Sequence, residues 1–145
     1  WEDWVERLKA YRRSVLGHAS RRAYSPEIVA SVLRAADMVR QNMRQELPLT
    51  EVANAVNMSR SYFSRCFRDI IGKTYQDYVR DVRIEHAKQL LRHTQRSISW
   101  IAAESGYPNE RYFSRVFRRM TGLLPRDYRR RHRNGQQSHL WSPNT

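Results

Sequence analysis

The sequence predicts an all-α protein of about seven helices, in which two helix-turn-helix subdomains are joined by a long linker helix. One segment, Tyr62 to Gly72, returns 50 positions later as Tyr112 to Gly122. In each copy the apolar residues recur at intervals of three and four, which is the spacing of one face of an α-helix. A glycine ends each copy, as expected of a left-handed helix terminator. The apolar residues are Phe63, Cys66, Phe67 and Ile70 in the first copy, and Phe113, Val116, Phe117 and Met120 in the second.

The opposite faces of the two copies carry serine and arginine, and the whole chain is strongly basic. Its 145 residues have a net charge of +13. The length suits one domain or two very small ones, and the charge favours nucleic acid or an anionic membrane surface as partner. The single cysteine fits a reducing cytosol, and no apolar run approaches the ~18 residues of a membrane span. We therefore expect a cytoplasmic protein without membrane contact, with DNA as the first candidate partner.

Residues 1–25 are predicted to form an amphipathic helix, ending near Leu16, and a basic linker. This helix either packs on the rest of the domain or connects to a partner outside the sequence. Because the chain opens on Trp1 rather than Met, we expect a longer protein whose N-terminal sensor or receiver domain is missing here. The apolar residues at helical spacing are Trp1, Trp4, Val5, Leu8, Tyr11 and Val15.

A supporting helix should begin at Pro26 and run to about Asn42. Ser25 is a suitable N-cap, proline is favoured in the first turn, and an acid follows at the positive end of the helix dipole. The predicted buried stripe consists of Ile28, Val32, Ala36, Val39 and Met43.

The first helix-turn-helix is predicted over residues 49–71. A short helix from Leu49 to Val56 buries two valines and Ala53, whose small side chain lets the helices cross closely. A tight turn follows, and Ser59 caps the first copy of the repeated helix. Two helices, a short turn and a basic second helix are typical of this DNA-binding motif.

A long linker helix should extend from Tyr75 to about Leu91. Thr74 and Asp77 resemble a capping box, and no Gly or Pro interrupts the segment. Such a helix is roughly 25 Å long at 1.5 Å per residue. With the turns at its ends, it could separate two recognition helices by about one DNA turn, ~34 Å.

The second helix-turn-helix repeats the first with one extra residue in the turn. Ser97 should cap a helix from Ile98 to Ser105, and Asn109 should cap the second copy of the repeated helix. Pro125 starts a last helix ending near Arg131. The double motif therefore spans residues 26–133, and the polar tail, residues 134–145, is expected to be disordered.

These residues resemble the AraC/XylS family of bacterial transcription regulators over residues 49–131. Pro48 and Leu124 depart from the family pattern, where capping Ser or Thr residues are usual. The resemblance rests on the linker-helix residues Arg83, Ile84, Ala87, Leu90 and Leu91, and on the second-motif residues Ile101, Ala102, Gly106, Tyr107, Asn109, Tyr112, Phe113, Ser114, Arg115, Phe117, Arg118, Gly122, Pro125, Tyr128 and Arg129.

The resemblance implies that each recognition helix enters a major groove. Arg65 and Arg115 could then bind guanine bidentately, and Glu110 could accept a hydrogen bond from cytosine N4. The tyrosines that open the two copies could flank DNA, although packing is the simpler expectation. The expected base-contacting residues are Arg60, Ser61, Ser64 and Arg65 in the first motif, and Asn109, Glu110, Arg111 and Arg115 in the second.

Contacts to the DNA backbone are expected around the start of the helix at Ser97. Free amides at a helix N-terminus bind phosphate. Positive charge there should come from Arg68, Lys73, Arg96 and Arg118.

We expect no enzyme activity, no cofactor and no metal ion. Cys66 aligns with Val116 on the apolar face, which indicates a small core residue. The five histidines show no metal-ligand spacing, and no catalytic motif is present.

The expected function is sequence-specific binding of double-stranded DNA to control transcription. Activation is favoured over repression, and RNA polymerase is expected as a further partner. Three alternatives stay open. A non-specific nucleic-acid or RNA packager would show little sequence preference, a helical protein-interaction module would favour an apolar exposed face, and a membrane-active cationic peptide fits the charge but not the buried phenylalanines.

Overall fold

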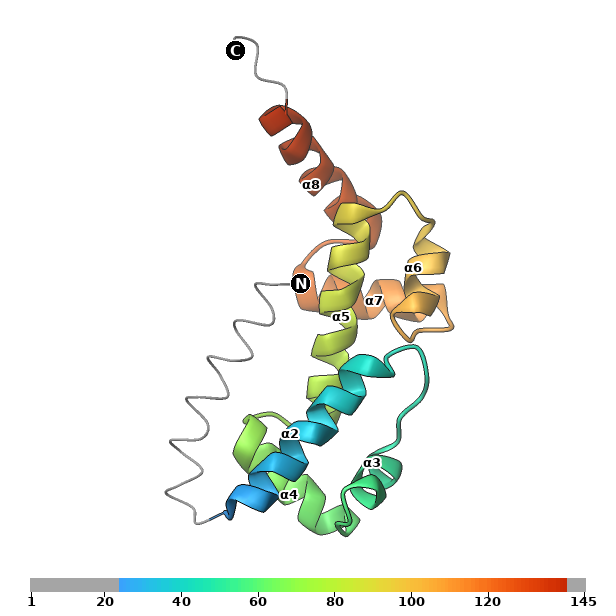
Figure 1. Ribbon diagram of the computed structural model, residues 1–145. Helices are drawn as coiled ribbons and strands as arrows, with labels where there is room; N and C mark the ends of the chain where they lie inside the picture. The colour runs from blue at the N-terminus through green and yellow to red at the C-terminus, as the bar shows by residue number, and fades with distance from the viewer. Residues whose placement is uncertain (1–23, 141–145) are drawn as a thin grey trace. The chain divides into compact units, whose positions relative to one another are not determined.

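The structure, a computed structural model, describes residues 24–140, which form seven helices and no strand (Figure 1). The predicted N-terminal amphipathic helix lies outside the described residues. The chain divides into two compact units at the step from Val82 to Arg83, inside α5. The helices are α2 (Pro26–Gln41), α3 (Leu49–Ala55), α4 (Arg60–Ile71), α5 (Tyr75–His93), α6 (Ile98–Glu104), α7 (Glu110–Thr121) and α8 (Pro125–Leu140).

Polar side chains begin the helices as the sequence predicted. Ser25, Ser59 and Ser97 each accept a hydrogen bond from the backbone N–H three residues on, at 3.0–3.2 Å. Asn109 does the same for α7 at 2.9 Å. These bonds satisfy amides that the first helical turn leaves without partners. Helices α3 and α8 are exceptions, because α3 begins after Pro48 without a side-chain cap and α8 begins after Leu124, whose side chain has no hydrogen-bond acceptor.

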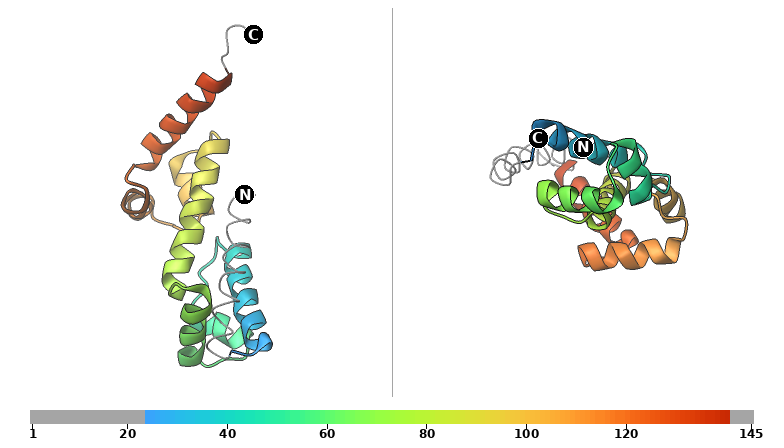
Figure 2. Two further views of the ribbon diagram at one scale, coloured as in Figure 1. Left: turned by 90° about the vertical axis from the view of Figure 1, so that its left-hand side faces the viewer. Right: turned by 90° about the horizontal axis from the view of Figure 1, so that it is seen from below.

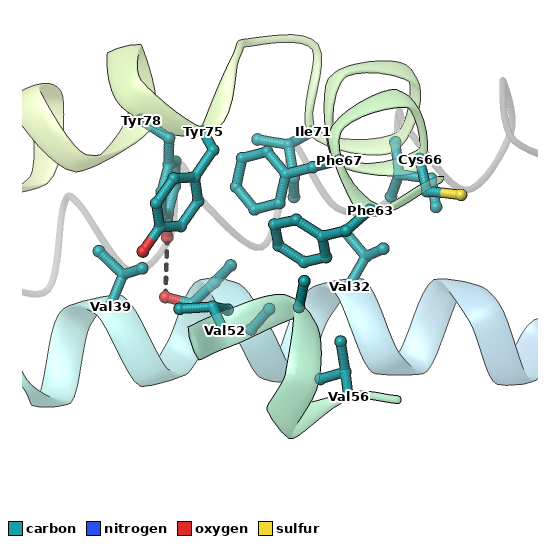
Figure 3. Close-up of a cluster of buried hydrophobic side chains, with 14 of the residues drawn as sticks. Val32, Val39, Val52, Val56, Phe63, Cys66, Phe67, Ile71, Tyr75 and Tyr78 are labelled. Carbon is teal, nitrogen blue, oxygen red and sulfur yellow. Dashed lines mark hydrogen bonds between the residues drawn. The ribbon is translucent and has the colours of Figure 1, made fainter. Parts of the chain in front are cut away.

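In the first unit, α2 packs against α3 and α4 around a cluster of aromatic rings. Figure 3 shows Phe63 and Phe67 of α4 between the valines of α2 and α3 and the two tyrosines that open α5. The ring centroids of Phe63 and Phe67 lie 5.5 Å apart, and Tyr78 meets Phe67 edge-on at 5.4 Å. Val32 and Cys66 are fully buried in the same cluster.

The second unit repeats this packing, and Figure 2 shows its helices from two further sides. Phe113 and Phe117 lie 5.7 Å apart, and Tyr128 meets Phe117 edge-on at 5.3 Å. These distances match the first unit to a few tenths of an ångström. The sequence repeat is therefore also a repeat of the core, as the prediction of two helix-turn-helix subdomains requires.

Three residues of the predicted apolar faces are not fully buried. Ile28 and Met43 of the stripe expected in α2 are half-buried, and Met43 lies beyond the end of that helix. Val29 and Ala35 are buried in their place.

The third residue is Met120 of α7. Met120 is 37% exposed, whereas its counterpart Ile70 is fully buried. The last turn of α4 is covered, because the hydroxyl of Tyr24 donates to Asp69 at 2.6 Å and α2 packs against α4. Among the described residues, no tyrosine makes the equivalent contact with Arg119 at the end of α7. The predicted helical period of the repeated helix is confirmed, but the predicted burial of Met120 is wrong. Burial depends on which neighbouring element covers the helix.

The last helix is longer than predicted. Helix α8 continues to Leu140, whereas the sequence predicted an end near Arg131 and a disordered tail from Asn134. Its first turn is anchored by buried Tyr128, and the following residues include no proline before Pro143. Arginine and glutamine are good helix formers, but Asn134 and Gly135 inside the extension are poor ones, so neither apolar periodicity nor local propensity accounts for its length. Residues 141–145 lie outside the described part.

The turns inside both motifs use left-handed backbone conformations. Asn57 has φ 58° in the first motif, and Gly106 has φ 88° at the same place in the second. Gly72 and Gly122 end α4 and α7 at φ 86° and 82°, and each N–H bonds to the carbonyl of the arginine four residues before. Both glycine terminators were predicted.

Replacing Gly122 with Ala should lower the free energy of unfolding by about 1–2 kcal/mol. An added Cβ would meet no atom within 4 Å, so the expected cost comes only from the left-handed conformation that L-residues disfavour. Urea unfolding followed by circular dichroism would measure it. Gly122→Asn is the control and should cost less, since Asn tolerates this conformation. Equal stability of the Ala variant and the parent would contradict the assignment.

Candidate nucleic-acid interface

Helix α4 exposes a polar face because its phenylalanines are completely buried on the other side. Phe63 and Phe67 have no exposed surface, which fixes the rotation of the helix on the first unit. The predicted base-contacting residues of this helix then all point to solvent. They are Arg60, Ser61, Ser64 and Arg65.

Helix α7 presents the matching face of the second unit. Glu110, Arg111 and Arg115 are exposed along it. Asn109 is also exposed, but its Oδ1 accepts the hydrogen bond from the N–H of Tyr112 at 2.9 Å. Its amide oxygen therefore caps the helix, and only its amide NH₂ group is left for another partner.

The arginines on these two faces are not neutralised within the described structure. No described carboxylate forms an ion pair with Arg60, Arg65, Arg111 or Arg115. Charge on the described surface is instead paired along α2 and α5, as in the contact of Arg80 with Asp77 at 3.4 Å. Helices α4 and α7 thus keep these guanidinium groups available for an anionic ligand.

The five residues predicted to contact the DNA backbone are divided between the units. Arg68 and Arg118 are exposed in the last turns of α4 and α7. Lys73 is held by Asp81, with Nζ and Oδ2 2.6 Å apart, so part of its charge is already compensated. In the second unit, Arg96 lies 4.9 Å from the ring centroid of Trp100, and the hydroxyl of Ser97 caps α6.

The second unit also contains a set of arginine–aromatic contacts that the sequence did not predict. Arg83 lies over Tyr107 at 5.3 Å, and Arg92 lies over Tyr128 at 5.5 Å. On the exposed face, Arg115 lies 6.0 Å from the ring centroid of Tyr112. Tyr112 is itself 53% exposed, so it packs less than expected. The i, i+3 spacing of tyrosine and arginine in α7 is the signal that could have indicated the last contact.

Packing within the units shifts the pKa values of several ionisable groups, among them Tyr24 and His132. The hydrogen bond to Asp69 raises the pKa of Tyr24 to about 12. Burial, and then the positive charges of Arg92, Arg131 and Lys88, lower the pKa of His132. His132 is therefore neutral at pH 7, and it packs its ring against Tyr128 at 4.2 Å.

The described residues contain no arrangement typical of metal binding or of membrane insertion. No three His, Cys, Asp or Glu side chains among them come together as a set of metal ligands. Cys66 lies in the core with no exposed surface. No helix between Pro26 and Leu140 is both long and apolar enough to cross a membrane.

Comparison with known proteins identifies the fold and the family. A family model described as a helix-turn-helix domain matches residues 52–131. The chain is 33% identical to the C-terminal domain of AraT, a response regulator from Geobacillus stearothermophilus, covering 74% of this chain and 87% of that one with a TM-score of 0.68. The DNA-binding domain of AdpA, solved in complex with a target DNA, shares the fold at a TM-score of 0.70 and 23% identity, over 73% of this chain and 96% of that one.

Curated relatives are much longer than this chain. Over 65 residues it is 48% identical to the transcriptional activator RhaR of Yersinia pseudotuberculosis, which covers 45% of this chain and 22% of the activator. It also spans 13% of the length of uncharacterized regulators of Staphylococcus aureus, at 32% identity over 68% of this chain. The repeated core, the capped recognition helices and these matches together show that the chain belongs to the AraC/XylS family of helix-turn-helix transcription regulators.

Proposed function

We propose that this chain binds double-stranded DNA in a sequence-specific manner and thereby regulates transcription, with α4 and α7 as its two recognition helices. The main support is that the same capped helix occurs twice, each time with its phenylalanines buried and its arginine side chains exposed. A helix with exposed polar donors fits the major groove, where base edges differ from one another. A protein-docking helix would expose apolar side chains, and a packager would not need two such similar recognition faces.

The proposed base contacts follow from the exposed faces. Arg65 and Arg115 would bind guanine through two N–H groups, and the short side chains of Ser61 and Ser64 would allow close approach to the bases. Arg60 and Arg111 lie one turn nearer the N-termini of their helices. Glu110 would accept from cytosine N4. Asn109 keeps only its amide NH₂ group for a base, because its oxygen caps α7.

Backbone contacts are proposed to fix the position of each unit on the duplex. In the second unit, the first amides of α6 lack helical partners and would bind a phosphate beside Ser97, with Arg96 adding charge. Arg118 would contact a phosphate at the end of α7, as Arg68 would at the end of α4. Lys73 is the weakest of these candidates, since it would have to share its charge with Asp81.

The activity of the whole protein is proposed from its relatives. A matching relative is named as a transcriptional activator and another as a response regulator. Activation, a sensor or receiver domain on the N-terminal side and a contact with RNA polymerase are therefore our proposals for the complete protein. A cytoplasmic location stays a prediction from composition.

Footprinting should show two protected stretches about 10 bp apart on an asymmetric site. The site would first be selected from a random DNA pool with the 145-residue chain. One recognition helix in each of two successive major grooves produces this pattern, because the groove returns to the same side of the duplex after one turn. A single protected groove with saturating, folded protein would contradict the use of both motifs.

Arg115→Ala and Arg118→Ala should separate base recognition from general charge. Loss of a bidentate guanine contact is expected to cost roughly 1–3 kcal/mol on the selected site and to relax preference at one base position. Loss of a phosphate contact should weaken binding to all DNA sequences alike. It should also reduce the slope of log K against log salt concentration by about 1. Titrations of cognate and random DNA at several salt concentrations would measure both effects. If the two variants lose affinity equally on both DNAs, Arg115 does not read a base.

Inserting one Ala between Val82 and Arg83 should abolish most specific binding. We propose that α5, which is continuous across this step, couples the two motifs rigidly. One added helical residue rotates everything beyond it by about 100° and shifts it ~1.5 Å, while the contacts within each unit keep their register. Binding to random DNA should therefore persist.

Circular dichroism and thermal melting provide the control for this insertion, since the variant should stay helical and unfold cooperatively. A flexible linker would absorb one residue. Near-native affinity of the folded variant for the selected site would therefore decide for the flexible alternative.

A further inference from the structure

The second unit contains a row of contacts that ends at its exposed recognition arginine. The guanidinium of Arg83 lies 5.3 Å from the ring centroid of Tyr107. The rings of Tyr107 and Tyr112 are 5.9 Å apart and inclined at 60°. The guanidinium of Arg115 then lies 6.0 Å from the centroid of Tyr112. We call this set the Arg–Tyr row.

The row is anchored in the core at its inner end. Tyr107 is 5% exposed, and its ring also contacts Phe113 at 5.6 Å. The Nε of Arg83 is buried and makes no hydrogen bond, so the ring of Tyr107 is a principal partner of that guanidinium. The buried ring of Tyr107 therefore gives the ring of Tyr112 a fixed contact surface.

The first unit offers a natural comparison, because it lacks the row. Met58 occupies the place of Tyr107: the N–H of Met58 donates to Ala53 at 2.9 Å, and the N–H of Tyr107 donates to Ala102 at 2.8 Å. No aromatic ring therefore lies at this place beside Tyr62, which is 37% exposed against 53% for Tyr112. Among the described residues, no cation–π contact joins Tyr62 to Arg65.

This difference between the two units affects how far Arg65 and Arg115 are restrained in the protein without DNA. An exposed arginine loses side-chain freedom when it binds a base, and a side chain already held near its bound position loses less. An aromatic face attracts a guanidinium within about 6 Å of its centroid. Arg115 has such a face within 6.0 Å, whereas Arg65 makes no such contact among the described residues, although the Tyr-Phe-Ser-Arg segment is the same in both helices.

We propose that Tyr112 is a specificity-determining residue that acts by positioning Arg115 for its base, with Tyr107 as its support. This inference rests on the proposed base contact of Arg115. It makes the second motif the more discriminating of the two at the position its arginine reads. The tyrosine hydroxyl plays no part, since the attraction comes from the ring.

The test compares the affinity for the selected site with affinities for its three single-base variants at the Arg115 position. Tyr112→Leu should reduce this discrimination roughly two- to fivefold, which corresponds to the about 0.5–1 kcal/mol of an exposed cation–π contact. Tyr112→Phe keeps the ring and should retain the discrimination. In an Arg115→Ala background, Tyr112→Leu should have no further effect on it.

The first motif provides the matched control. Tyr62→Leu should leave discrimination at the Arg65 position unchanged, because no ring holds that arginine. Both tyrosines are more than a third exposed, so the variants should fold, and thermal melting would verify that each does.

Four other results would contradict the inference, and each would indicate a different reason. If Arg115→Ala abolishes discrimination while Tyr112→Leu leaves it unchanged, Tyr112 does not position the arginine. If Tyr112→Phe behaves like Tyr112→Leu, the hydroxyl contacts DNA itself. A uniform loss on all four sequences would make Tyr112 a backbone contact or a folding residue. If Arg115→Ala leaves discrimination intact, the proposed base contact fails, and the inference fails with it.

Discussion

Burial of two phenylalanines, one turn apart, is the constraint on which each half of this protein depends. Both rings have no exposed surface in either copy, and full burial of a side chain of this size is worth about 1.5–3 kcal/mol. Once these rings are buried, the rotation of each helix is fixed, and its arginines must face outward. The surface proposed to bind DNA is therefore a consequence of the core, and a change that loosened the rings would also misdirect the arginines.

Much of the fold could be predicted because its signals are local. Ser59, Ser97 and Asn109 mark helix starts through bonds that span three residues, and Gly72 and Gly122 mark helix ends through backbone conformations that few other residues adopt. The apolar period placed the phenylalanines correctly. Resemblance to a known family then supplied what local signals lack, namely which exposed residues to consider for DNA.

The parts that could not be predicted depend on contacts between distant residues or on competing interactions. Burial of Ile70 but not Met120 depends on what covers the end of each helix, and the Tyr24–Asp69 bond joins residues 45 positions apart. Lys73 was assigned to phosphate from its charge alone, without knowledge that Asp81 holds it. The length of α8 was missed because neither an apolar period nor local helix propensity, which Asn134 and Gly135 lower, marks the extension.

The unequal cover of the two recognition helices has a further consequence for their local stability. The end of α4 is closed by Ile70 and by the bond to Tyr24, whereas the end of α7 leaves Met120 half in water. Local opening is easier where fewer apolar contacts must be broken. The amide hydrogens in the last turn of α7 should therefore exchange with solvent sooner than those in the last turn of α4, although the two helices are copies of one repeated segment. Two copies of one helix can thus differ in local stability at their C-terminal ends.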